Sequence, residues 1–335
     1  MHRIFVLFTA LLCLGAPAEV VSVTATRLVQ QPLLQPGQFP WTEAGVFNPT
    51  AIKVGTQTIL LFRAQDRKGT SRVGYAASSD GMHFKIRPEP VLSPDAEYEK
   101  NGGVEDPRVV AIGSVYYLTY TGYDGHSAQL CLAVSRDLIH WQRKGVIMPA
   151  YRGTWNTQWT KSGAIVPRKI KGRWWMYYLG TRTDHDGKPR DYMGLAESTD
   201  RLHWKDATDQ PVLPRRPGAF DSRVMEPGPA PFVTDAGILL LYNGADDHLV
   251  YGPGWVLFDQ SDPGRVLARS GQSFIAPVLD WERNGQVPNV IFLEGTVGQS
   301  LSKYTLSLTG YYGAADKYIG ALQLKIVLRP LPTSE

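Results

Sequence analysis

Acidic, amide and basic side chains recur along this chain of 335 residues where short apolar strands are expected to begin or end. Cleavage of a glycosidic bond needs one carboxylic acid to protonate the leaving oxygen and a second group to activate water or attack directly. Unpaired carboxylates are poor structural residues, because burying an uncompensated charge is costly. The sequence therefore predicts a site built from carboxylates, amides and cations: Asn48, Glu105, Asp106, Lys161, Glu226, Asn289 and Glu294 near strand starts, and Arg63, Asp66 and Asp316 after second strands.

A structural interpretation of the same acids stays open. Each acid could pair with Arg63, Arg108 or Lys161 only to balance charge in the interior, since ion-pair networks also cluster charges. Aromatic residues near the same positions favour a sugar site, because aromatic rings offer flat apolar faces beside polar groups. The aromatic candidates for stacking on sugar are Tyr123, Trp155, Trp159 and Tyr311.

A recurring motif indicates the elements that must position these side chains. Ala77–Phe84, Ala133–Trp141 and Ala196–Trp204 each contain a small-residue strand, a Ser-x-Asp turn and a His-aromatic pair. Degenerate copies follow at Leu257–Asp262 and Ile319–Leu322, so the period is about 60 residues. Because the His-aromatic pair recurs with the repeat, we assign it to packing and hydrogen bonding rather than to chemistry.

Each copy follows an apolar strand, with a further short strand and a glycine turn before it. The expected apolar strands are 58–62, 115–120, 174–178, 238–242 and 304–312. Four strands in each of five units predict an all-β fold, a five-bladed β-propeller with four-stranded antiparallel blades in one domain spanning residues 19–335. A β-sandwich would not repeat one motif at a fixed period. In a propeller the inner strands converge on a central channel, so polar residues at their starts share one pocket.

Residues 1–18 have the order of a secretory signal peptide. His2 and Arg3 precede an apolar run, and the small residues 16–18 follow it before Glu19. The run is too short to span a bilayer, so we expect export, to a periplasm or out of the cell, and no membrane association of the mature chain. A lipoprotein is disfavoured because Leu12 precedes Cys13, and removal of the signal leaves Cys131 without a disulfide partner.

Charge and composition exclude several classes of function. The formal net charge is +4 and no run of Lys or Arg stands out, which argues against a nucleic-acid partner. No Cys/His cluster has zinc spacing, so no metal site and no cofactor are predicted, although an all-oxygen calcium site stays open. The sequence does not indicate the oligomeric state.

The run 103–108, Gly-Val-Glu-Asp-Pro-Arg, resembles glycoside hydrolase family 130, the β-mannoside phosphorylases and β-mannosidases. The similarity includes the runs 47–49, 62–64, 287–290 and 312–316 and extends over nearly the whole mature chain. It implies a five-bladed fold, a β-mannoside oligosaccharide as substrate and Asp106 as the general acid of an inverting reaction. It also implies that Asn48, Arg63, Asp66 and Asp316 hold the mannosyl unit. Glu105, Arg108, Lys161 and Asn289 complete the predicted substrate-binding set.

The family's two activities, hydrolysis and phosphorolysis, differ in whether water or phosphate accepts the mannosyl unit. Phosphorolysis needs clustered cations for phosphate, for which Lys161 and Arg182 are the candidates. Glu226 and Glu294 stand where such cations or small neutral residues are expected, and a carboxylate suits a water-activating base. The sequence therefore favours an exported inverting hydrolase that releases mannose from β-1,2- or β-1,4-linked manno-oligosaccharides, with Glu226 preferred as the base.

Two alternatives and a rival family are weighed against this hydrolase. The first alternative is a phosphorylase that forms mannose 1-phosphate. The second is a non-catalytic carbohydrate-binding propeller. An arabinanase or fructosidase type would share the architecture but would not predict the runs at 105–108 and 312–316.

Overall fold

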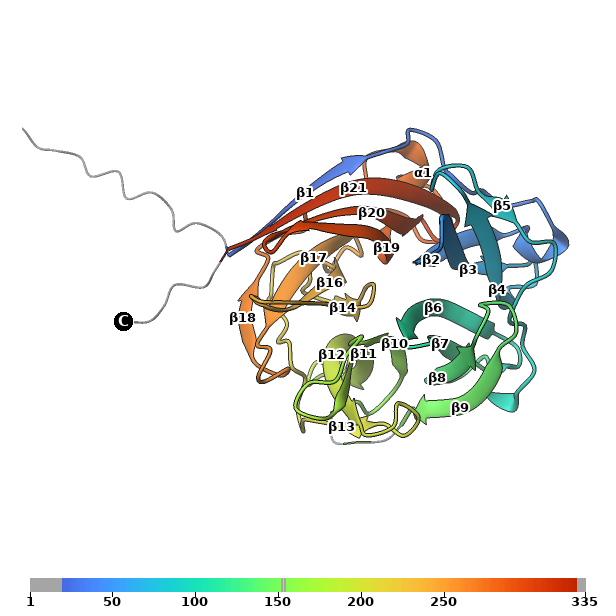
Figure 1. Cartoon of the computed structure of the whole chain (residues 1–335). Helices are drawn as coiled ribbons and strands as arrows, with labels where there is room; N and C mark the ends of the chain where they lie inside the picture. The colour runs from blue at the N-terminus through green and yellow to red at the C-terminus, as the bar shows by residue number, and fades with distance from the viewer. Residues whose placement is uncertain (1–19, 152, 154, 330–335) are drawn as a thin grey trace, which may run out of the picture.

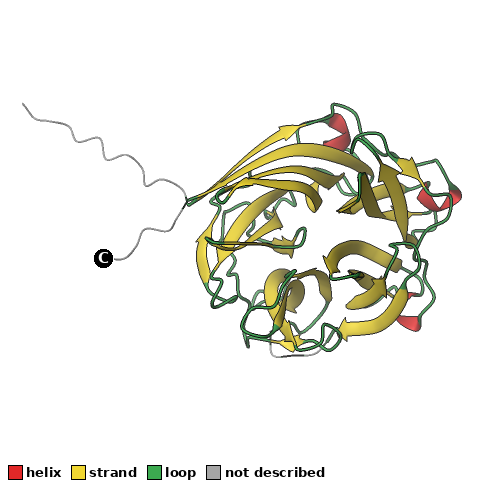
Figure 2. Ribbon diagram, in the orientation of Figure 1, coloured by secondary structure: helices red, strands yellow, loops and turns green. Residues whose placement is uncertain are grey.

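The computed structural model describes residues 20–151, 153 and 155–329, so the predicted signal peptide lies outside the described residues. The described chain is all-β, and its helical segments are single turns at the periphery of the molecule (Figure 2). These segments are two 3-10 turns, Pro40–Thr42 and Glu97–Glu99, and the short helix α1 (Asp280–Arg283). None of the helical segments in these ranges is long and apolar enough to cross a bilayer.

The strands form five antiparallel groups in chain order, arranged as a ring in Figure 1. The first group contains β2 (Gly45–Val54), β3 (Gln57–Gln65), β4 (Ser71–Ser78) and β5 (Lys85–Ile86). The second contains β6 (Gly103–Ile112), β7 (Val115–Tyr123), β8 (Ala128–Ser135) and β9 (Gln142–Met148). The third contains β10 (Thr160–Ile165), β11 (Trp174–Thr183), β12 (Pro189–Ser198) and β13 (Lys205–Asp206).

The last two groups depart from a simple four-strand repeat. The fourth has five strands, because its inner strand is divided into β14 (Val224–Pro227) and β15 (Phe232–Thr234), which both pair with β16 (Gly237–Ala245). β17 (Tyr251–Phe258) and β18 (Val266–Arg269) follow. The fifth consists of β19 (Ile291–Ser302), β20 (Thr305–Ala314), β21 (Tyr318–Leu328) and the N-terminal β1 (Val21–Arg27). β1 pairs with β21 from Val21 opposite Leu328 to Arg27 opposite Leu322, so the first and the last described strands lie in one sheet.

Hydrogen bonding divides these strands into four sheets, because one parallel residue pair, Ser71 and Gly103, joins the first group to the second. The expected antiparallel all-β fold is confirmed, and the five-bladed propeller stays a prediction. Each of the four apolar clusters is shared by neighbouring groups, as when Tyr177 of β11 stacks on Phe258 of β17 at 4.5 Å. Burial of these faces is the main force that holds the groups together.

The recurring Ser-x-Asp turns are structural, as the sequence indicates. In the three clear copies an aspartate accepts backbone N–H groups of its own turn and contacts the following histidine Nδ1 at 2.7 Å. The histidines are His83, His140 and His203, and their side chains are 86–90% exposed. These pairs therefore fix the outer turns rather than form a site.

Candidate active site

The inner strands are interrupted by bulges at the residues that carry polar side chains. The register with the second strand shifts between Phe47 and Pro49 in β2, and equivalent shifts follow in β6 and β10. Asn48, Asp106 and Ser162 lie in these bulges with φ of 47°, 49° and 58°. Non-glycine residues rarely adopt this left-handed conformation, and a bulge re-aims the side chain that it carries. β19 has a similar shift around Glu294.

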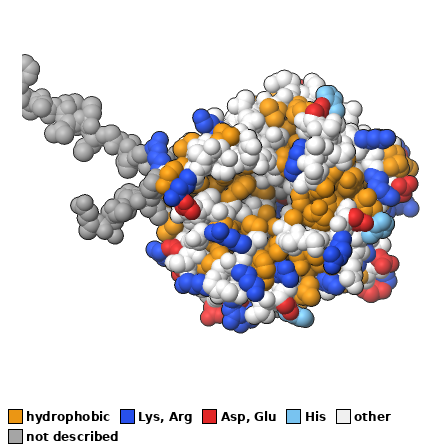
Figure 3. Space-filling view, viewed as in Figure 1, with side chains coloured by type: hydrophobic (Ala, Val, Ile, Leu, Met, Phe, Trp, Pro, Cys, Tyr) orange, Lys and Arg blue, Asp and Glu red, His pale blue; other side chains and the backbone are white. Residues whose placement is uncertain are grey.

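The bulges of β2 and β6 direct Asn48 and Asp106 into a cavity of about 150 Å³. The face seen in Figure 3 is hollowed near its centre. A neighbouring cavity of about 380 Å³ lies between the third and fourth groups. Both are lined by Lys161, Glu226 and Tyr251, so the two cavities adjoin at these residues. The polar side chains of the smaller cavity are Asn48, Arg63, Asp106, Lys161, Glu226 and Asp316.

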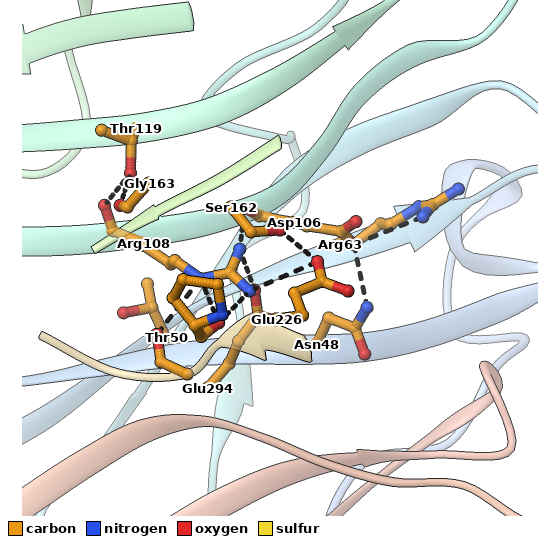
Figure 4. A network of polar contacts seen from close by, with 12 residues as sticks. Asn48, Thr50, Arg63, Asp106, Arg108, Thr119, Ser162, Gly163, Glu226 and Glu294 are labelled. Atoms are coloured by element: carbon orange, nitrogen blue, oxygen red, sulfur yellow. Dashed lines mark hydrogen bonds and ion pairs between the residues drawn. The ribbon is translucent and has the colours of Figure 1, made fainter. Parts of the chain in front are cut away.

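Asp106 is buried and held by two donors. Asn48 Nδ2 donates to Asp106 Oδ1 at 2.9 Å, and Arg63 Nη1 lies 3.3 Å from the same oxygen (Figure 4). Burial alone would raise the pKa of Asp106, but the cations Arg63 and Lys161 outweigh it and lower the pKa below its usual value. The Asp106 carboxyl is therefore ionised in the free site.

Glu105 holds Arg63 rather than lining either cavity. Arg63 Nη2 donates to Glu105 Oε1 at 2.6 Å, its Nε donates to Ser71 Oγ at 3.0 Å, and its guanidinium lies 4.9 Å from the Phe47 ring centre. These contacts fix the plane of the guanidinium, which leaves Nη1 facing Asp106.

Arg108 links the two glutamates from behind the cavity. Its Nη1 lies 2.6 Å from Glu294 Oε1 and its Nη2 lies 3.7 Å from Glu226 Oε1. Arg108 Nη2 also donates to the Pro227 carbonyl at 2.7 Å, so it fixes β14 and the position of Glu226 (Figure 4). Glu226 also accepts a hydrogen bond from Ser162 Oγ.

The two glutamates differ in what they reach. Burial raises the pKa of Glu226 to about 7, although Arg108 opposes the shift, and its carboxylate lines both cavities. Glu294 is fully buried and lines neither. Its ion pair with Arg108 is close, but no N–H points along a hydrogen bond to either oxygen, and burial raises its pKa well above the usual value. Glu226 is therefore the glutamate that can contact a bound acceptor.

Comparison with known proteins shows the family of this chain. The profile of glycoside hydrolase family 130, described as beta-1,4-mannooligosaccharide phosphorylase, matches residues 26–327. The chain belongs to glycoside hydrolase family 130. A 1,2-beta-oligomannan phosphorylase from Thermoanaerobacter sp. (strain X514) is 35% identical, over 90% of this chain and 97% of its own.

Solved structures include relatives that are described as hydrolases. One comes from work stating that the family of mannoside phosphorylases contains glycoside hydrolases targeting β-1,2-mannosidic linkages in Candida mannan. It is 30% identical, covers 95% of this chain and 99% of its own, and has a TM-score of 0.78. A putative glycoside hydrolase from Parabacteroides distasonis is also 30% identical, with a TM-score of 0.78 over 89% of this chain and 95% of its own.

Besides Glu105 and Arg108, two more predicted substrate-binding residues of this family 130 chain, Asp66 and Asn289, lie outside the lining of both cavities. Asp66 accepts the backbone N–H groups of Lys68 and Thr70 and pairs with Arg72 at 2.8 Å. Asp246 makes the same turn contacts in the fourth group, so this position recurs as a turn-forming aspartate. Asn289 has φ of 59°, and its carbonyl accepts the N–H of Tyr251 at 2.9 Å.

Two of the four aromatic residues predicted to stack on sugar, Trp155 and Tyr311, do not line either cavity. Trp155 and Tyr311 are 2% and 0% exposed and belong to the core, and the Tyr311 hydroxyl donates to the Gly81 carbonyl. Trp159 does line the larger cavity, with Tyr123 at 6.1 Å between ring centres.

The sequence also misplaced the second cation and missed two residues of the larger cavity. Arg182 stacks on Tyr192 at 4.4 Å and pairs with Asp184 at 3.1 Å, away from both cavities. Arg223 and Asp191, which the sequence analysis did not single out, line the larger cavity instead. Across residues 20–151, 153 and 155–329, no three His, Cys, Asp or Glu side chains are grouped to hold a metal ion.

Proposed function

We propose that this family 130 chain is an exported five-bladed propeller enzyme that hydrolyses β-mannosides with inversion. The observation that carries the hydrolytic reaction is Glu226, a buried carboxylate with a pKa of about 7 that faces both cavities. A general base is most effective when its pKa lies near the working pH. A carboxylate at this position also repels a phosphate dianion. Export rests on the signal-like residues 1–18.

Asp106 and Glu226 take complementary roles in this proposal. Water attacks the anomeric carbon of the mannosyl unit on the face opposite the leaving oxygen, and Glu226 accepts the proton of that water. Asp106 supplies a proton to the leaving oxygen, directly or through a sugar hydroxyl, and mannose leaves as the α anomer. Asn48, Arg63 and Asp316 hold the mannosyl unit in the smaller cavity.

In the free site Asp106 is ionised and Glu226 carries the proton, which is the reverse of what the reaction needs, because the pKa of Asp106 is lowered and that of Glu226 is raised. The working form, with Asp106 protonated and Glu226 ionised, is therefore a minor one-proton form. Substrate binding favours it, since a sugar that displaces water around Asp106 disfavours the charged carboxylate.

Phosphorolysis is the second candidate, and the curated relatives favour it over hydrolysis. Four relatives that match most of this chain are named as phosphorylases of β-1,2- or β-1,4-mannosides. Lys161 and Arg223 could contact phosphate in the larger cavity. The three relatives at 31–35% identity are named for β-1,2-linkages and the one at 25% for β-1,4, so we expect β-1,2-mannosides as substrates.

The two activities separate in one assay. The mature protein is incubated with β-1,2- and β-1,4-mannobiose, with and without phosphate, and the first anomer released is followed by proton NMR. Hydrolysis predicts α-mannose at a rate independent of phosphate. Mannose 1-phosphate formed only with phosphate contradicts the proposal in favour of the second candidate, and no product on either substrate favours a binding protein.

The roles of the two acids are tested with the same substrates. Asp106→Asn should lower the rate on mannobiose by about 10²–10⁴-fold but retain activity on a dinitrophenyl β-mannoside, whose leaving group needs no acid. Glu226→Gln should lose both activities. The reverse pattern would exchange the roles.

A further inference from the structure

The larger cavity has a charge pattern that the proposed reaction does not explain. It is lined by two cations, Lys161 and Arg223, and two carboxylates, Asp191 and Glu226. Two cations in an enclosed pocket form an anion site, because electrostatic attraction is much stronger there than in bulk water. A hydrolase that uses water has no need of such a site.

Neither cation is neutralised by a direct ion pair. Within the described chain, no carboxylate oxygen lies within 4.0 Å of Lys161 or Arg223. Lys161 Nζ lies 5.4 Å from the ring centre of Trp159, at the edge of the same cavity. Both cations therefore keep donors available for a bound oxyanion.

Asp191 is placed to oppose them. Its backbone N–H donates to the Arg223 carbonyl at 3.4 Å, so β12 carries it beside the residue that precedes β14. Thr181 Oγ1 donates to Asp191 Oδ1 at 2.6 Å and fixes the carboxyl group. Burial raises the pKa of Asp191, and Lys161 and Arg223 are the two cations that counter the shift. No ion pair within 4.0 Å involves this carboxylate among the described residues, so its charge acts on the cavity as a whole.

We propose that Asp191 is a specificity-determining residue that acts as an internal counter-anion to Lys161 and Arg223 and so excludes phosphate from the acceptor cavity. This inference rests on the proposed hydrolase. At a pH above 7, where Asp191 and Glu226 are both ionised, the four lining charges sum to zero, and an entering oxyanion meets two carboxylates as well as two cations. Loss of the Asp191 charge alone leaves a net positive cavity.

The test is binding of inorganic phosphate, which needs no turnover. Asp191→Asn keeps the size of the side chain and an acceptor for Thr181. Calorimetric titration at a pH above 7, where Glu226 is ionised, should show a Kd for phosphate at least about tenfold lower than that of the wild type, or about 1.4 kcal/mol. Adding Arg223→Met to this variant should abolish the gain. Asp184→Asn is the matched control, because Asp184 pairs with Arg182 and Arg215 outside both cavities and should leave phosphate binding unchanged.

Each outcome bears on the inference separately from the hydrolase. Equal phosphate affinities for the wild type and Asp191→Asn would overturn the inference and leave the hydrolase standing. A wild type that binds phosphate and forms mannose 1-phosphate would overturn the hydrolase, and the affinity ratio between the two proteins would still decide the role of Asp191. If Asp191→Asn does not fold, Asp191→Ser removes the same charge, and its Kd for phosphate should be lower than that of the wild type by the same factor.

Discussion

At the residue scale, the surroundings of Asp106 and Glu226 predict the pH dependence of catalysis. The pKa of Asp106 is lowered by Arg63 and Lys161, and that of Glu226 is raised to about 7 by burial. The reactive form carries one proton on the pair, so kcat/KM should fall above pH 7, where both acids are ionised, and below the pKa of Asp106, where both are protonated. Initial rates on mannobiose from pH 3 to 9 measure the fall of kcat/KM above pH 7, the upper limb of the pH profile, and the fall at low pH, its lower limb.

Glu226→Gln tests the assignment of the upper limb. In this variant kcat/KM should be too low to show the fall above pH 7, whereas the control Asp184→Asn should still show that fall. A limb near pH 7 that survives in Glu226→Gln would assign the titration to another group, such as Asp316, whose pKa burial raises to about 6.

Residue type and family resemblance predicted part of this site for identifiable reasons. Asn48, Arg63 and Asp106 were found because they stand in short specific runs, and the structure brings them into one cavity. Asp191 and Arg223 carry no such signal, because they stand neither at the start of an inner strand nor at the end of a second strand. Asp191 lies in a third strand and Arg223 just before an inner one, and only the packing of neighbouring groups brings them together.

At the element scale, the left-handed backbone conformation in the bulges of the inner strands costs stability, and variants of Ser162 measure that cost. Ser162 has φ of 58° and donates its hydroxyl hydrogen bond to Glu226. Both Ser162→Ala and Ser162→Gly lose this donor, so the pKa of Glu226 should rise and the upper limb of kcat/KM should move to higher pH in both. Glycine adopts a positive φ freely, so Ser162→Gly should be more stable than Ser162→Ala by about 1 kcal/mol in urea unfolding.

This pair of variants separates geometry from chemistry. Equal stabilities would mean that the left-handed bulge at Ser162 stores no strain. An unmoved limb in both variants would mean that the hydroxyl does not influence Glu226.

The strands themselves were predictable, whereas the bulges were not. Apolar runs such as 58–62 and 238–242 lie within β3 and β16, because a short continuous apolar run bounded by turn residues is typical of a strand buried on both faces. A positive φ at Asn48 or Asp106 has no local signal of that kind. It arises from the neighbouring strands and from the contacts of the side chain with its partners.

At the scale of the whole molecule, the fifth strand group is completed by the N-terminal β1, which the sequence did not reveal. β1 is short, and its partner β21 lies at the other end of the chain, so no local pattern indicates the pairing. The junction also contains a buried ion pair. Arg27 donates to both carboxylate oxygens of Glu282 at 2.7 Å, and Tyr312 donates to Glu282 Oε1 at 2.8 Å.

Replacing Arg27 tests how much this junction contributes to stability. Glu282 is fully buried, so Arg27→Met should leave an uncompensated carboxylate and lower the free energy of unfolding at pH 7 by about 3 kcal/mol. Burial would raise the pKa of Glu282, but Arg27 and the other donors lower it. Its ionised form therefore stabilises the fold above pH 4.5, and that stabilisation is lost as the pH falls through the lowered pKa.

The difference between wild type and Arg27→Met in urea unfolding should accordingly shrink as the pH is lowered from 7 to 3. Arg67→Met is the matched control, because Arg67 pairs with Glu43 at 2.9 Å while its own side chain is 81% exposed. Surface pairs of this kind contribute at most about 1 kcal/mol. If both variants lose equally little stability at pH 7, β1 is held by its hydrogen bonds to β21 and by apolar burial alone, and the ion pair between Arg27 and Glu282 is dispensable.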